Sequence, residues 1–311
     1  MDIQLRDDIR FINKFLYSTQ KHRIQLSNWM DAKKRDGIEP SDRVKKLFDA
    51  MEAQEAAAKR IAKDVVSLTT IWGEFFENVR GVGECYATSL IAEIKDINNF
   101  KTPSSLWAYF GMTAQYVLAS CSKGHKIMMA SDKHKTCPVF ASNEDDPCGG
   151  TITITERVQG VAPKRKAGYH YLFNSTGKTL CWKIAGNLVK QGDDYFKDTY
   201  RTAKKHYSTK AEAQGLIVVP AEQMRTMAAK DKGKYISLGH IDNRAKRKMV
   251  KIFLVYLWTA WRRVEKLETR QPYVQEKLGH TKILEWAELK ELLREGRMKA
   301  KEIQEDGDDN V

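Results

Sequence analysis

Cysteine and histidine side chains, the usual ligands of structural zinc, gather in one stretch of this sequence. Three of the five cysteines, Cys121, Cys137 and Cys148, fall there together with His125 and His134. A hairpin with one pair of ligands in each of two loops would close a tetrahedral site. We therefore predict a zinc ion held by Cys121, His125, Cys137 and Cys148, with His134 as the substitute for His125. Four protein ligands leave no position for water, so this zinc would be structural.

Short strands are expected on both sides of these ligands. Residues 116–119 are apolar, and the stretch TITITERV that begins at Thr151 alternates as a strand does. We predict a zinc-ribbon-like β-hairpin inserted over residues 116–158. Neither half has the two-residue gap between ligands of a strong zinc-ribbon signature, so a metal-free loop with scattered cysteines is the alternative.

A Gly-Val-Gly turn lies upstream of this hairpin. Gly81 and Gly83 allow positive backbone φ angles and the close approach of another backbone. The helix predicted directly after them would point its first amide groups, around residues 84–87, at a phosphate. This arrangement is typical of a helix-hairpin-helix that clamps the DNA backbone. A tight turn that only packs against a neighbouring helix is the alternative.

Two stretches of basic residues lie further along the chain. Lys164, Arg165 and Lys166 precede the aromatic residues of 169–173, a mixture that meets phosphates and stacks on bases when it is not part of a core. The second stretch opens a long predicted helix and comprises Arg244, Lys246, Arg247, Lys248 and Lys251. Cations at a helix start oppose the helix macrodipole, so we predict that they serve a ligand. A solvated basic face is the alternative.

The whole chain is basic. It carries a formal charge of +13, with 53 Lys and Arg against 40 Asp and Glu, although the last ten residues hold acids and no bases. Such a surplus favours a polyanionic partner, because each cation placed on a phosphate releases a condensed counterion. We therefore predict that the basic residues, with Gly81 and Gly83, bind DNA or structured RNA.

The first 78 residues predict a helical hairpin. Leu5, Ile9, Ile12 and Leu16 mark one amphipathic helix, and a helix breaker at residues 37–40 precedes the next. In the second helix, apolar residues recur in the heptad pattern of a coiled coil at Val44, Leu47, Met51, Ala58, Ile61, Val65, Leu68, Trp72 and Phe75. This seam would pack within one chain or between two copies in a homodimer.

Cysteine usage and hydropathy bear on the compartment. Five cysteines without a leading apolar segment argue against a secreted disulfide framework, so we expect a reducing, cytoplasmic setting. The longest apolar run, residues 249–261, is shorter than the roughly 20 residues that cross a bilayer. We predict a buried helix there and no membrane partner.

The Gly-Val-Gly turn opens a longer motif. It continues with a helix ending in Ala-Glu-Ile, then an Asp, a Phe and a Leu-Ala-Tyr-x-Gly stretch. The positions of this motif are Arg80, Gly81, Gly83, Ala87, Leu90, Ala92, Glu93, Ile94, Asp96, Phe100, Leu106, Ala108, Tyr109 and Gly111. Through it, residues 79 to about 265 resemble the second domain of the bridge-RNA-guided insertion-sequence transposases and the related pilin-gene invertases. The likeness is strong over this motif and looser afterwards.

This resemblance implies DNA recombination, with two departures from the family. Relatives have a RuvC-like first domain whose four acids hold magnesium, joined to the second domain by a coiled coil. Residues 1–40 predict helix, with no strand to present such an acid, so magnesium chemistry is not supported by this chain. Relatives also carry a serine that attacks the DNA phosphodiester. Counting from Gly111 reaches Ala119, so the adjacent Ser120 is a positional candidate, with an ordinary loop serine as the alternative.

These observations predict a mainly α protein in three parts. They are a helical hairpin or coiled coil over residues 1–78, a helix-hairpin-helix-containing transposase-like domain with its β-hairpin insertion over 79–270, and a C-terminal helix with an acidic tail over 271–311. The expected function is DNA binding within the insertion-sequence transposase family, acting in transposition or recombination through the serine. The alternative is a non-catalytic DNA- or RNA-binding accessory or architectural protein of a mobile element.

Overall fold

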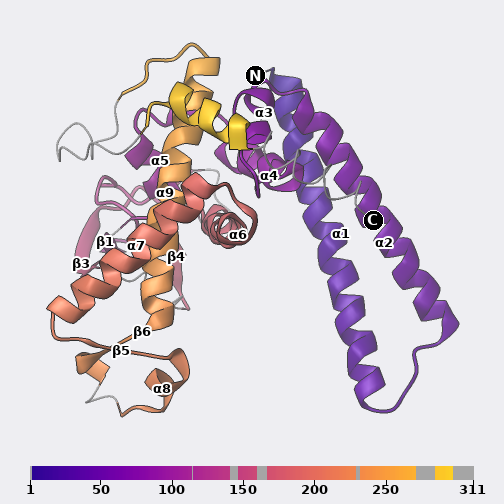
Figure 1. Ribbon diagram of the computed structural model, residues 1–311, viewed down its shortest axis with the longest axis horizontal. Helices are drawn as coiled ribbons and strands as arrows, with labels where there is room; N and C mark the ends of the chain where they lie inside the picture. Colours follow the sequence, from indigo (N-terminus) through magenta and orange to yellow (C-terminus); the bar gives the residue numbers. More distant parts are fainter. Residues whose placement is uncertain are drawn as a thin grey trace.

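The computed structural model describes residues 2–113, 115–140, 146–159, 167–228, 232–270 and 284–296. Helices dominate and the sheets are small, so the predicted mainly α class is confirmed. Figure 1 shows a two-helix hairpin that projects from a larger body containing the other helices and the sheets. The basic residues Lys164, Arg165 and Lys166 and the acidic tail lie outside the described residues.

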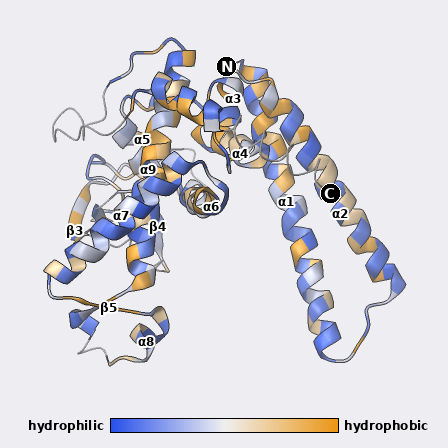
Figure 2. Cartoon of the chain, in the orientation of Figure 1, coloured by the Kyte–Doolittle hydropathy of each residue, from blue (hydrophilic) through white to orange (hydrophobic). Residues whose placement is uncertain are grey.

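Helices α1 (Ile3–Arg35) and α2 (Asp42–Ser67) form the predicted hairpin. Ile9 and Leu16 of α1 are buried, as the amphipathic pattern requires. The breaker at residues 37–40 separates the helices, and Gly37 adopts a φ of +77° in the turn. In Figure 2 the projecting end of the hairpin is mainly hydrophilic, whereas hydrophobic residues concentrate along the central helix of the body.

The buried seam of α2 differs from the predicted heptad series. The residues of α2 that are buried are Glu55, Ala58, Ala62 and Val66. Leu47 and Ile61 remain 49% exposed, and Leu68 remains 71% exposed. Small alanines allow the two helices to approach closely, so the packed stripe is displaced by about one position from the larger apolar side chains. Packing of the predicted seam against a second copy stays a prediction.

Helix α4 (Glu84–Ile94) joins the hairpin to the body. Its Ser89 hydroxyl donates a hydrogen bond to Asn13 Oδ1 in α1 at 2.8 Å, and its Thr88 hydroxyl lies 3.2 Å from the Ala62 carbonyl oxygen in α2. Both hydroxyl-bearing residues are buried. Polar partners on both hairpin helices therefore fix the position of α4 against them.

Short helices surround α4 along the chain: α3 (Thr70–Glu74) and η1 (Phe76–Asn78) precede it, and η2 (Ile97–Asn99) and α5 (Pro103–Tyr109) follow. The start of α5 is set by its own sequence. Thr102 and Ser105 form a reciprocal capping box, and Pro103 occupies the first turn, where its missing N–H costs nothing.

Four strands form the sheet: β1 (Gln115–Cys121), β2 (Lys126–Met129), β3 (Ile152–Gln159) and β4 (Tyr169–Tyr171). Their order is β3-β1-β2-β4, with β1 antiparallel to both of its neighbours and β4 parallel to β2. Both stretches that were predicted as strands lie in it. Strand β3 is an edge strand, and its Ile154 is 37% exposed.

Helix α9 (Leu238–Val264) is the centre of the body, and α6 (Ser175–Gln191) and α7 (Asp194–Ala213) pack against it. A smaller unit with β5 (Ile217–Val219), α8 (Ala221–Thr226), η3 (Lys232–Lys234) and β6 (Tyr235–Ser237) precedes α9. The apolar run 249–261 is almost entirely buried, which confirms the predicted buried helix. None of the described helices has the length and apolarity that crossing a bilayer demands.

A further helix over residues 286–296 returns to the beginning of the body. Trp286 is buried and donates a hydrogen bond to Glu74 Oε1 at 2.8 Å, and Lys290 Nζ lies 2.5 Å from Glu74 Oε2. The rings of Trp286 and Phe75 are 5.0 Å apart. Because these contacts join distant parts of the chain, this helix stabilises the segment that leads into α4.

Candidate metal centre and nucleic-acid interface

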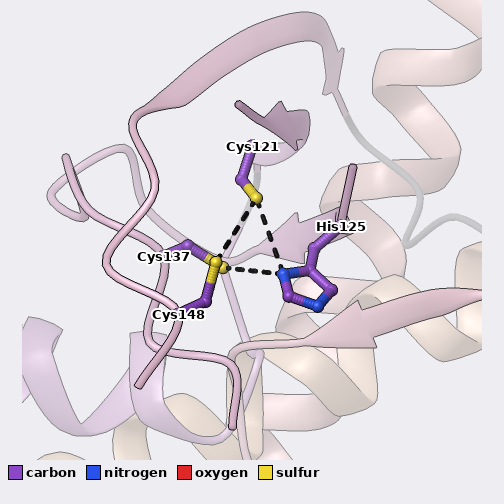
Figure 3. Close-up of side chains that lie close together, drawn as sticks. All are labelled: Cys121, His125, Cys137 and Cys148. Atoms are coloured by element: carbon purple, nitrogen blue, oxygen red, sulfur yellow. Dashed lines mark hydrogen bonds between the residues drawn. The ribbon is translucent and has the colours of Figure 1, made fainter. Parts of the chain in front are cut away.

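Two loops of the four-stranded sheet bring four metal-ligand side chains together (Figure 3). Cys121 ends β1, and His125 lies across the turn that leads to β2. Cys137 and Cys148 come from the segment between β2 and β3. The donor atoms of all four lie within 4.8 Å of one another, and the three cysteines are buried.

The spacing of these donors fits a tetrahedral metal. Zinc bonds of about 2.3 Å to sulfur and about 2.0 Å to nitrogen imply separations of about 3.8 Å between sulfurs and about 3.5 Å between sulfur and nitrogen. The Sγ atoms of Cys121 and Cys148 are 3.8 Å apart. His125 Nδ1 lies 3.5 Å from Cys121 Sγ and 3.6 Å from Cys137 Sγ. The cluster could therefore hold a metal ion such as zinc.

Local backbone geometry positions the ligands. Gly124 turns the chain between Cys121 and His125 with a φ of +89°, a conformation that favours glycine. The Lys123 amide donates to Cys121 Sγ at 3.3 Å. A Cβ on Gly150 would lie 3.4 Å from the sulfurs of both Cys121 and Cys148. Glycines thus leave room for the sulfurs and supply the tight turn around them.

The thiols differ in acidity. Burial alone would raise the pKa of Cys121, but hydrogen bonds from the backbone of His125 and Lys123 and from Cys148 lower it to about 6. Burial raises the pKa of Cys137 to about 11. A cation at the centre would favour the thiolate of every cysteine, because metals bind the deprotonated form.

The structure distinguishes between the two histidines considered as fourth ligand. His125 is the one in the cluster, whereas His134 is exposed and outside it. The His125 ring also makes an edge-to-face contact with His170 of β4, with ring centroids 5.3 Å apart. The fourth strand therefore helps to orient the imidazole.

Ser120 lies next to this cluster, half-buried in β1. It is paired in the sheet with Lys126 of β2 and Thr153 of β3. Among the described residues, no side chain forms a hydrogen bond with its hydroxyl. Its role as a nucleophile therefore stays a prediction.

The glycine turn before α4 serves packing at one position and is open at the other. Gly81 has a φ of +88°, and a Cβ there would lie 3.3 Å from Asn187 O and Gly192 N at the end of α6. The adjacent Arg80 amide donates to Asp193 Oδ2 at 2.8 Å. Gly83 is exposed, with nothing within 4 Å of such a Cβ. A phosphate contact was predicted for both glycines. Of the two, only Gly83 has open space for a phosphate.

The predicted basic residues of α9 take different positions. Lys246 pairs with Asp242 at 2.7 Å, which neutralises its charge locally, and Lys248 is exposed. Arg244 lies over the Tyr207 ring at 4.6 Å, and Lys251 lies over the Trp107 ring at 4.0 Å. Arg244, Arg247 and Lys251 follow one another at helical spacing and share one partly buried face.

One cation beside this face was missed from the sequence. Lys178 of α6 lies 3.0 Å from the Tyr116 hydroxyl and 4.7 Å from the centroid of that ring. The sequence could have indicated it through its position in the helix, because Lys178 precedes the buried Cys181 and Ala185 by three and seven residues. A lysine in line with a buried stripe is directed toward other elements, not into solvent.

Comparison with known proteins agrees with the sequence motif. The sequence profile of the Transposase IS116/IS110/IS902 family matches residues 73–127, which include the glycine turn, α4, α5, β1 and the first two cluster ligands. No curated protein and no solved structure matches the chain. The matched segment, less than half of the chain, supports a transposase-family member with a role related to transposition.

Proposed function

We propose that this protein is a DNA-binding member of the transposase family. The observation that carries the proposal is the family match over residues 73–127, because it covers the turn and helices on which the motif resemblance depends. The net charge of +13 supports a nucleic-acid partner. DNA is preferred over RNA because transposition acts on DNA; structured RNA remains a prediction.

The contacts that we propose are made mainly with phosphates. Gly83 leaves the start of α4 open, and α9 contributes Arg244, Arg247, Lys248 and Lys251 as cations. Lys246 contributes less because Asp242 already neutralises it. Phosphate contacts release counterions and carry little sequence information, so affinity should fall steeply with salt for any duplex.

A salt titration with fluorescently labelled duplex DNA tests the proposal. We expect Lys248→Gln to lower the slope of log affinity against log salt by about one, as the loss of one phosphate contact does. Lys46→Gln, at an exposed position near the far end of the hairpin, is the matched control and should leave the slope unchanged. Absence of DNA binding by the wild-type protein at low salt would rule the function out.

The catalytic version of the function is tested separately. If Ser120 attacks a phosphodiester, incubation with branched or duplex DNA gives a covalent protein-DNA adduct, because the seryl oxygen forms a phosphoester as the sugar hydroxyl leaves. The adduct should disappear in Ser120→Ala and persist in Ser122→Ala, whose serine lies in the adjoining turn. DNA binding without any adduct would favour the alternative, a non-catalytic accessory or architectural protein.

We further propose zinc as the metal of the Cys121, His125, Cys137 and Cys148 cluster, with a structural role. Three sulfurs and one nitrogen at tetrahedral spacing favour zinc over the oxygen-preferring magnesium and calcium. The metal would hold the turn at the end of the matched segment, with Cys121 and His125, to the loop that carries Cys137 and Cys148. Zinc analysis of the purified protein, expected to give about one equivalent, tests this assignment.

A further inference from the structure

Lys178 of α6 and Lys251 of α9 both lie within reach of the charge of Arg247 in α9, and we call these three residues the cationic cluster. The aromatic neighbours of the two lysines are Tyr116 of β1 and Trp107 of α5. Helix α9 packs against both α5 and α6 (Figure 1). Arg247 and Lys251 are one helical turn apart on α9, and the positive charge of Arg247 acts on both lysines.

Aromatic rings replace water around the two lysines. Lys178 Nζ lies 4.7 Å from the centroid of the Tyr116 ring and 5.0 Å from that of Phe173. Lys251 Nζ lies 4.0 Å from the centroid of the Trp107 ring, whose Nε1 donates to the Lys251 carbonyl oxygen at 3.1 Å. Both lysines are half-buried. Their ammonium groups are therefore fixed in place and partly dehydrated.

The ammonium groups of Lys178 and Lys251 have N–H donors that no acceptor among the described residues satisfies. The Tyr116 hydroxyl donates to the Gly111 carbonyl oxygen and lies 3.0 Å from Lys178 Nζ, so it accepts one of that lysine's three N–H groups. Within the ranges that the structure describes, no carboxylate pairs with Lys178 or Lys251. An anion would supply the missing acceptors and the missing negative charge.

The protonation equilibria point the same way. Burial, and then the charge of Arg247, lower the pKa of Lys178 to about 8, and the same two causes lower the pKa of Lys251 to about 8. Keeping like charges in a partly dehydrated place is unfavourable for the empty protein. A bound oxyanion would reverse this effect, because it favours the charged form of each lysine.

We propose that the cationic cluster of Lys178, Arg247 and Lys251 is a binding site for one phosphate group of a nucleic-acid backbone. The identity of the ligand rests on the proposed function, in which the nucleic acid is DNA. The site deepens that function by placing a partly buried phosphate contact beside the Tyr-x-Gly element, because Tyr116 connects Lys178 to Gly111. Exposed cations such as Lys248 would instead make screened surface contacts.

Inorganic phosphate is the first probe. Thermal unfolding of the full chain is followed with increasing phosphate against chloride at constant ionic strength. We expect phosphate to raise the unfolding midpoint of wild type and of the charge-matched control Lys46→Gln, whose lysine is exposed near the far end of the hairpin. Lys178→Met and Lys251→Met should lose this response, and their midpoints without phosphate should equal or exceed that of wild type, because a dehydrated charge has been removed.

The phosphate response and the midpoint in chloride, taken together, distinguish a binding site from a structural role. Lysines that merely held the fold would give variants with lower midpoints in chloride, and that result would overturn the proposal. An unchanged phosphate response in both methionine variants would overturn it as well. Lys178→Arg, which keeps the charge, should retain part of the response.

A labelled DNA duplex is the second probe and identifies the source of the phosphate. We expect Lys178→Met and Lys251→Met each to weaken duplex binding at least tenfold. Wild-type binding of duplex with no effect of either variant would overturn the site while the proposed function stands. Binding of phosphate at the cluster, with no binding of duplex by wild type, would overturn DNA as the ligand and the proposed function with it.

Discussion

Removal of the proposed zinc should unfold the four-stranded sheet without unfolding the helical body. The sheet has its own small core, whose buried members are Val117, Ala119, Cys121, Ile127, Met129, Cys137, Val139 and Cys148. Three of these eight are cluster cysteines, so apolar packing alone gives the sheet little stability. The helical body has a separate and much larger core. A chelator therefore acts on one core and leaves the other intact.

The magnitude follows from the balance of these contributions. Structural zinc sites of this ligand type contribute on the order of 10–16 kcal/mol of apparent binding free energy at pH 7. A whole domain is usually stable by only about 5–15 kcal/mol. A sheet with five non-ligand residues in its core cannot replace such a contribution. We therefore expect local unfolding to be nearly complete once the metal is removed.

Limited proteolysis with metal analysis measures this effect. Chelation, or Cys148→Ser, should abolish the one equivalent of zinc and open cleavage sites between residues 121 and 159, while fragments containing α9 stay resistant. Cys85→Ser is the control, because Cys85 is half-buried and outside the cluster. Zinc content near zero in the wild-type protein, or unchanged protection in metal-free protein, would refute the reasoning.

Three more results should follow from the described contacts. Glu55 accepts hydrogen bonds from Arg23 and Lys59, which outweigh burial and lower its pKa from 4.5 to about 2. Its ionisation thus contributes about 3 kcal/mol to the free energy of unfolding above pH 4.5, and this contribution is lost as the pH falls toward 2. Glu55→Gln should therefore lower the urea midpoint strongly at pH 7 and much less at pH 3. An equal loss at both pH values would contradict this. Gly81→Ala should destabilise the protein by about 1–3 kcal/mol, because Gly81 has a left-handed backbone conformation and contacts the end of α6. Gly83→Ala should barely change the urea midpoint. Equal effects of the two variants would exclude the packing role of Gly81. Leu289→Ala should lower the free energy of unfolding by about 2–5 kcal/mol and expose residues 286–296 to hydrogen exchange, because Leu289 is buried. Unchanged hydrogen exchange would show that this helix does not dock through Leu289.

Prediction from the sequence succeeded where neighbours along the chain decide the outcome. The hairpin breaker at residues 37–40 and the strand at TITITERV depend on local turn and period-two patterns, and both elements lie where they were predicted. The predicted heptad series of α2 was displaced, because the choice between a buried stripe with Ala62 and Val66 and one with Leu47 and Ile61 depends on how closely α1 approaches. That distance is not encoded in the period of a single helix.

The candidate sites divide in the same way. Ligand types are visible in the sequence, so Cys121, Cys137 and Cys148 could be named together with two histidines. The choice of His125 over His134 required the folded loops, because ligand geometry depends on the hairpin turn and on the return of the chain near Cys148.

The sequence by itself determined which residue types are present and which local elements they form: metal-ligand side chains, a glycine turn and a basic helix. Only the tertiary structure decided that Gly81 packs on the end of α6 and that Lys178 lies beside Tyr116, within reach of the charge of Arg247. The physical reason is range. Backbone preferences and helical period act over a few residues, whereas dehydration and charge proximity arise when elements far apart in the chain pack together.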